Sequence, residues 1–188
     1  KNCCGGVASI EAVSLSDWSK VIDQIAKDLH QGTIKTTDLN KDYILKTGKV
    51  LSEGISEGYS VNKFSEADVK NIVSFQKNAY LFGTHKNIAF QERIATFLTD
   101  EKGKLRGFAD FKKDVLKLDD EYNQNYLQAE YQTAVRSGQA AKQWEDIQRR
   151  AERYPNLIYK TVGDEHVRDE HAALDGKIRP IDHSFWQT

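Results

Sequence analysis

The end of the chain gathers side chains that can bind metal ions or transfer protons. Three of the five histidines, His166, His171 and His183, fall there together with several aspartates. Imidazole and carboxylate groups are common zinc ligands and common general bases. His166 and His171 are five residues apart, about 140° on an α-helix, unlike the i, i+4 pair of a metalloprotease. A metal site with His171 and Asp175 as candidate ligands is therefore less favoured than structural hydrogen bonding in turns.

An enzymatic interpretation uses the same cluster. His171 would act as a general base oriented by Asp175 or Asp164, or the cluster would hold a divalent cation in a nuclease-like site. The segment offers neither a nucleophile nor an oxyanion-binding group beside these residues. The sequence therefore favours a protein that is not an enzyme and that uses no cofactor.

Two short strands are predicted to position this cluster. Residues 157–162 are rich in β-branched and aromatic side chains, and residues 177–181 form a second alternating stretch. Gly163-Asp164 and Asp175-Gly176 are turn signals, and the residues between them are expected to form a short helical turn. We expect the two strands to pair, with each glycine at positive φ.

The chain before Pro155 is predicted to be almost entirely helical. No proline interrupts it, and apolar residues recur at the spacing of one helical face. Ser65 to Asp68 resembles a capping box, while Gly83 and Ser137-Gly138 are expected to lie at breaks between helices. The helices expected from these signals span residues 16–32, 38–55, 65–83, 88–98, 105–118, 122–136 and 139–153.

These elements predict an α+β fold, with a mainly helical body and a small C-terminal β-containing subdomain. Gly48, Gly54 and Gly58 weaken the second helix by about 1 kcal/mol each. The Gly-, Ser- and Glu-rich residues 52–60 are therefore a candidate hinge. We expect three parts: an N-terminal helical region (1–60), a helical body (61–155) and a strand-turn-strand subdomain (156–188).

The first predicted helix carries an apolar stripe with two possible uses. Ser16 is its expected N-cap, and Gly32 ends it. The stripe either packs into the protein's own core, which is the favoured interpretation, or docks into a groove of a partner protein. The residues in question are Trp18, Val21, Ile25 and Leu29.

Composition limits the classes of protein to consider. The 188 residues are 39% hydrophobic, enough for one ordinary core, and no apolar run approaches the roughly 20 residues of a membrane span. The adjacent Cys3 and Cys4 imply no disulfide framework and receive no role. The sequence contains no methionine, as expected of a fragment from a longer reading frame. The cytoplasm is the default compartment.

Charge argues against a strongly basic nucleic-acid coat. The 27 basic residues nearly balance the 28 acidic ones. A DNA-binding interpretation would use Lys112, Lys113, Lys117, Arg149, Arg150 and Arg153. Acidic residues interleave with these basic ones, so ion pairing along helices is favoured. The acidic residues are Asp110, Asp114, Asp119, Asp120, Glu145, Asp146 and Glu152.

The tail as a whole has a recognisable order of residues. It reads Tyr159-x-Thr161-x-Gly163-Asp164, then Val167-Arg168-x-x-His171-x-x-Leu174-Asp175-Gly176, then Asp182 and Phe185-Trp186. This string closely resembles the signature of the phage Mu protein F-like head morphogenesis proteins. Weaker likeness at Gly83-Thr84, at Ala89-Phe90 and from Tyr122 to Ala129 extends the resemblance over roughly residues 80–186.

The resemblance implies a minor capsid protein of a tailed-phage head, encoded in a bacterial prophage. Such a protein is associated with the portal and supports procapsid assembly and DNA passage. Its implied partners are the phage portal and capsid or scaffolding proteins, with DNA as a weak further partner and no membrane. It would act in the bacterial cytoplasm during assembly and in the virion.

The signature residues are interpreted as a rigid, self-braced structural element in preference to a reactive site. Asp164 and Asp175 would accept backbone N–H bonds, and Arg168 would bind a carboxylate through two bonds. His171 would bond a backbone carbonyl, and an aromatic pair would cap a small core. The residues assigned this structural and interaction role are Tyr159, Thr161, Gly163, Asp164, Val167, Arg168, His171, Leu174, Asp175, Gly176, Asp182, Phe185 and Trp186.

Overall fold

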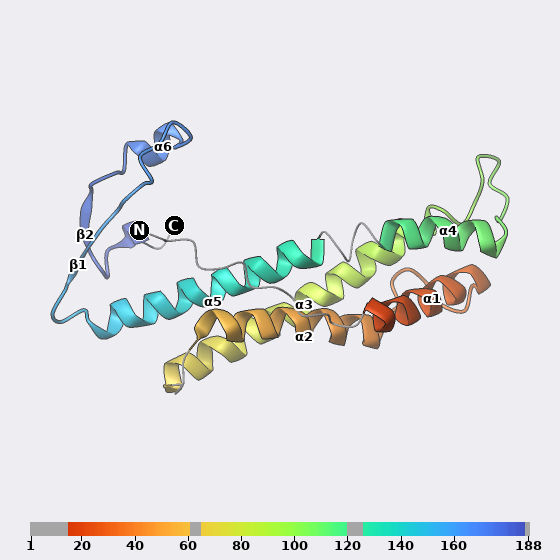
Figure 1. Cartoon of the computed structure of the whole chain (residues 1–188), viewed down its shortest axis with the longest axis horizontal. Helices are drawn as coiled ribbons and strands as arrows, with labels where there is room; N and C mark the ends of the chain where they lie inside the picture. Colours follow the sequence, from red (N-terminus) through yellow and green to blue (C-terminus); the bar gives the residue numbers. More distant parts are fainter. Residues whose placement is uncertain (1–14, 61–64, 120–125, 187–188) are drawn as a thin grey trace. The chain divides into compact units, whose positions relative to one another are not determined.

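The computed structural model describes residues 15–60, 65–119 and 126–186 (Figure 1). Internal contacts divide the chain into residues 1–141 and 142–188. The expectations for Cys3, Cys4, Asp120 and Tyr122 lie outside the described residues. No helix in the described ranges has the length and apolar content needed to cross a membrane.

The first part of the chain is built around a core to which each of its described helices, α1 to α5, contributes. α1 (Leu15–Gln31) packs against α4 (Phe108–Asp119), and α2 (Lys41–Tyr59) runs along α3 (Glu66–Ala95). α5 (Leu127–Arg149) adds further core residues. The apolar stripe of α1, made of Trp18, Val21, Ile25 and Leu29, is buried in this core. The prediction that the stripe packs within the protein is therefore confirmed, and the alternative that it docks into a partner is wrong.

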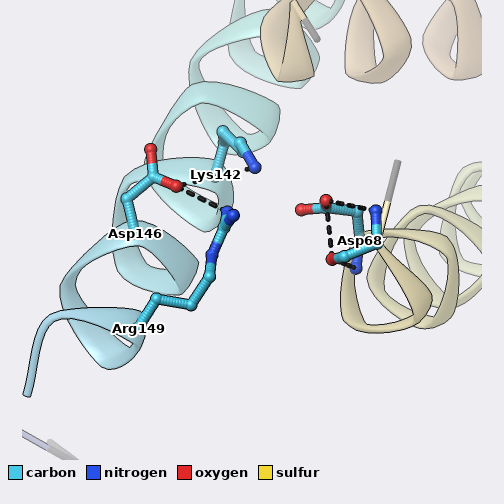
Figure 2. A network of polar contacts seen from close by, with 5 residues as sticks. Asp68, Lys142, Asp146 and Arg149 are labelled. Atoms are coloured by element: carbon cyan, nitrogen blue, oxygen red, sulfur yellow. Dashed lines mark hydrogen bonds and ion pairs between the residues drawn. The ribbon is translucent and has the colours of Figure 1, made fainter. Parts of the chain in front are cut away.

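α3 begins with the predicted capping box. The Ser65 side chain accepts from the backbone N–H of Asp68, and the Asp68 carboxylate accepts from the backbone N–H of Ser65 at 2.8 Å. Asp68 is labelled in Figure 2. The predicted end of this helix at Gly83 is wrong, because α3 continues to Ala95. Gly83 lies where α2 approaches: a Cβ at this position would lie 3.1 Å from the Ile44 carbonyl oxygen.

α5 is also longer than predicted. Ser137-Gly138, expected to be a turn, lies inside this helix. A Cβ at Gly138 would lie 2.4 Å from the Ile55 carbonyl oxygen, and one at Gly58 would lie 2.1 Å from the Val135 carbonyl oxygen. The predicted hinge is wrong for the same reason, since residues 52–59 are helical and Gly58 serves the close contact of α2 with α5.

The second part of the chain contains the predicted small sheet. β1 (Asn156–Ile158) pairs antiparallel with β2 (Ile178–Pro180), so the pairing is confirmed although both strands are shorter than predicted. The short helix α6 (Asp169–Ala172) lies between them in sequence, and the 3-10 turn η2 (Ser184–Trp186) follows β2. The fold is therefore mainly helical α+β, as predicted. The boundaries at residues 60 and 155 stay predictions.

Candidate functional site

The centre of the C-terminal segment is a contact between Tyr159 and His171. The Tyr159 hydroxyl lies 2.7 Å from His171 Nδ1, and the two rings are nearly parallel. Phe185 meets the Tyr159 ring edge-on, with 5.9 Å between the ring centroids. His171 therefore bonds a side chain instead of the predicted backbone carbonyl, and an aromatic cluster joins the residue that follows β1 to α6 and η2.

Asp175 closes the loop that leaves β1. Its Oδ1 accepts from the Thr161 backbone N–H at 2.8 Å and from the Thr161 hydroxyl at 3.2 Å. The Lys160 ammonium lies 3.7 Å from Oδ2. The backbone hydrogen bond from Thr161 is the main reason why the pKa of the Asp175 carboxyl is lowered, with a further contribution from the charge of Lys160.

Acid is expected to open this loop through Asp175. Because the folded-state pKa is lowered, the stabilisation by this carboxylate is present above the usual aspartate pKa of about 3.9 and is lost as pH falls through the lower folded-state value. Amide exchange of Thr161 followed by NMR from pH 6 to pH 2 measures this. Asp175→Ala removes the acceptor, so the protection of the Thr161 amide relative to its intrinsic exchange rate should be low throughout the range, whereas protection equal to that of the wild type would contradict the assignment.

The two signature glycines form turns as predicted. Gly163 has φ +73° and Gly176 has φ +76°, a region that side chains with a Cβ rarely adopt. The Gly176 backbone N–H donates to the Tyr159 carbonyl at 2.9 Å. After Gly163, Asp164 Oδ1 accepts from the His166 backbone N–H at 3.0 Å, which is an Asx-type turn.

The remaining signature residues are distributed around this frame. Arg168 precedes α6 and is largely exposed. Among the described residues its guanidinium pairs only with the nearby Glu170, through a single contact of 3.9 Å, instead of the predicted two-bond contact with a carboxylate. Val167 and Leu174 are half-buried, and Asp182 is exposed. The Trp186 indole N–H donates to the Pro180 carbonyl at 2.8 Å.

This arrangement does not assemble the chemistry of the enzymatic interpretation. His171, Asp164 and Asp175 each bond to different partners, and in the described residues no hydrogen bond or ion pair joins His171 to either aspartate. Within the same residues, no group of three or more His, Cys, Asp or Glu side chains is placed to hold a metal ion. The geometry suits a braced structural element.

Two residues of the DNA-binding interpretation, Lys112 and Arg149, form ion pairs. On α5, Asp146 accepts from Arg149 at 2.6 Å and lies 3.6 Å from the Lys142 ammonium (Figure 2). Lys112 pairs with Asp23 of α1 at 2.8 Å. These contacts give specific partners to part of the predicted basic set, in line with pairing along and between helices.

A second candidate surface, not anticipated from the sequence, is an apolar groove in the first part of the chain. Its volume is about 340 Å³, and α2, α3 and the start of α5 line it. Among the described residues of its lining, only Glu130 is charged, and its carboxylate is bound by the buried Lys86 at 2.6 Å. The lining residues are Leu51, Ile55, Phe75, Asn78, Ala79, Phe82, Tyr126, Ala129, Glu130, Thr133, Ala134 and Ser137.

A buried tyrosine supports the α2–α5 contact beside this groove. The Tyr131 hydroxyl donates to the Glu57 carboxylate. Burial, reinforced by this hydrogen bond and by the charge of Glu57, raises the pKa of Tyr131 to about 12. Tyr131 therefore stays neutral and hydrogen-bonded at physiological pH. The sequence signal that could have revealed this face is the small-residue spacing of Gly54, Gly58, Ala134 and Gly138.

Comparison with known proteins identifies one family. A family model described as Phage Mu protein F like protein matches residues 45–188, which is more than half of the chain. The match includes the whole C-terminal segment and begins within α2, upstream of the likeness seen in the sequence. No curated protein and no solved structure matches the chain.

Proposed function

The chain belongs to the Phage Mu protein F like family of phage head morphogenesis proteins, and on this premise we propose that it is a portal-associated minor capsid component of a tailed phage. In this role it supports procapsid assembly and DNA passage through contacts with portal and capsid or scaffolding proteins. The gene belongs to a bacterial prophage, and the protein acts in the bacterial cytoplasm during assembly and then in the virion.

The observation that carries this proposal is the family match across residues 45–188. Geometry supports a binding role, because the signature residues hydrogen-bond to one another and to neighbouring backbone without forming a reactive cluster. The apolar groove is the surface we assign to a partner helix. The Glu130 carboxylate of the described lining is already neutralised by Lys86, so the groove suits the uncharged face of an amphipathic helix.

A groove substitution tests this role. Phe82 lines the groove and is 43% exposed, so Phe82→Asp places an unpaired charge on the proposed contact face without emptying the core. We expect at least about a tenfold loss of incorporation into heads, which corresponds to about 1.4 kcal/mol of binding free energy. The measurement is the amount of this protein in purified procapsids after co-expression with the portal and capsid proteins of the same phage.

The matched control is Val73→Asp. Val73 lies on the same helix and is 44% exposed, but it does not line the groove. This variant should be incorporated like the wild type. Equal incorporation of both variants would remove the groove from the proposal, and absence of the wild-type protein from procapsids would reject the portal-associated role itself.

A further inference from the structure

We propose that His183 is a pH-sensitive N-cap whose protonation releases the Ser184–Trp186 turn from the C-terminal hairpin. His183 Nδ1 accepts the backbone N–H of Phe185 at 3.0 Å. Phe185 is the second residue of η2, and the side chain that precedes a helical turn accepts from this position when it acts as an N-cap. The His183 carbonyl accepts the Trp186 backbone N–H at 3.1 Å and completes the turn.

Histidine is an uncommon N-cap residue. Serine, threonine, asparagine and aspartate are the preferred N-caps, and their oxygens remain acceptors throughout the physiological pH range. A neutral imidazole has one acceptor nitrogen, and a protonated imidazole has none. The bond to Phe185 therefore requires the neutral ring with its proton on Nε2. Protonation places an N–H against the Phe185 N–H, and the cap must break.

The capped turn holds an aromatic pair against the hairpin. Phe185 and Trp186 meet edge to face, with 4.7 Å between their ring centroids, and Phe185 also contacts Tyr159 of the signature. The Trp186 indole is tied to the Pro180 carbonyl at the end of β2. Loss of the cap therefore loosens two half-buried aromatic side chains in the part of the chain that carries the family signature.

The neighbouring titratable and charged groups do not duplicate this effect. Asp182 precedes the cap and is exposed, and the Arg179 guanidinium on β2 donates to the Ile178 carbonyl. His171 contacts the turn only through Tyr159, whose hydroxyl can either donate or accept. The Tyr159–His171 bond therefore survives protonation by reversing its direction, whereas the bond from His183 to Phe185 has no such alternative.

NMR of the full ¹⁵N-labelled chain tests the proposal. Long-range ¹H–¹⁵N spectra at pH 8 should show His183 with its proton on Nε2. Acidification to pH 5 crosses the range in which histidines change charge, about pH 5 to 8. The exchange protection of the Phe185 and Trp186 amides should then fall about fivefold, the ratio expected for loss of a typical N-cap.

Variants separate the cap from other effects of pH. His183→Asn keeps a neutral acceptor, so protection should be equal at pH 8 and pH 5. His171→Gln should retain the wild-type pH dependence. A fivefold loss of protection that persists in His183→Asn, or a wild-type His183 with its proton on Nδ1 at pH 8, would overturn the proposal.

Discussion

Alanine at Gly58 or Gly138 is expected to destabilise the protein by about 2 kcal/mol or more at either position. The added Cβ would lie 2.1 Å from the Val135 carbonyl oxygen in the first case and 2.4 Å from the Ile55 carbonyl oxygen in the second. Both oxygens belong to helix backbones, so the clash is relieved only by moving α2 and α5 apart. The gain in helix propensity, about 1 kcal/mol, is smaller than this cost. Urea unfolding followed by circular dichroism at 222 nm measures the difference.

Gly107→Ala is the matched control for both variants. Gly107 precedes α4, has no heavy atom within 4 Å of an added Cβ and does not have a positive φ. Its substitution should change the free energy of unfolding by less than about 0.5 kcal/mol. Because an added Cβ at Gly138 also lies 3.3 Å from the Gly58 Cα, the double variant should lose less than the sum of the single losses. Wild-type stability in both single variants would contradict the close contact of these helices.

Glycines at helix contacts explain why the sequence predicted helix breaks that the structure does not contain. Gly83 and Gly138 were interpreted from intrinsic propensity, which penalises glycine in a helix by about 1 kcal/mol. Each faces the backbone of a neighbouring helix: an added Cβ would lie 2.4 Å from a carbonyl oxygen at Gly138, which forces a separation, and at a tight 3.1 Å at Gly83. Tertiary packing therefore decides the outcome at these positions, and packing partners across the chain are not visible in a single sequence.

Local signals were more reliable than long-range ones. The capping box at Ser65 and the antiparallel pairing of the C-terminal strands depend on residues close in sequence or on turn chemistry, and both were predicted. The apolar stripe of α1 is also buried, as the helical spacing of its residues predicts. The strands are shorter than expected, because the chain after β1 is held by the Thr161–Asp175 bonds instead of a continued ladder.

In the candidate site, too, the features that depend on local sequence were predicted and those that depend on long-range contacts were not. Positive φ at the signature glycines and backbone acceptance by Asp164 and Asp175 followed from residue type. The hydrogen-bond partner of His171 could not be predicted in this way. Tyr159 is 12 residues away in the sequence, and only the folded turn and short helix bring its hydroxyl to the His171 ring. The apolar groove was missed entirely, since its lining comes from three helices whose contact depends on small residues.

Removal of the Glu130 carboxylate is expected to have the second large effect. Lys86 on α3 is nearly buried, with 6% of its side chain exposed, and its ammonium lies 2.6 Å from the Glu130 carboxylate of α5. Glu130→Ala leaves this ammonium without its partner in a site with little water, a change that typically costs 3–5 kcal/mol. Because 21% of the Glu130 side chain is exposed, water partly replaces the carboxylate and we expect a loss near about 3 kcal/mol. Urea unfolding of the variant measures this loss.

Substitution of Lys86 instead of Glu130 should cost less stability, and the double variant tests whether the two residues are energetically coupled. In Lys86→Met the remaining carboxylate is the more exposed member and can be hydrated, so the loss should be smaller than in Glu130→Ala. The variant that combines Lys86→Met with Glu130→Leu buries no charge and restores apolar contact between α3 and α5, so it should be more stable than Glu130→Ala alone. A double-mutant cycle made of Lys86→Met, Glu130→Leu and their combination should give a coupling energy above about 1 kcal/mol. Additive losses would instead mean that Lys86 reaches solvent freely, and the groove would then carry an unneutralised carboxylate suited to a basic partner.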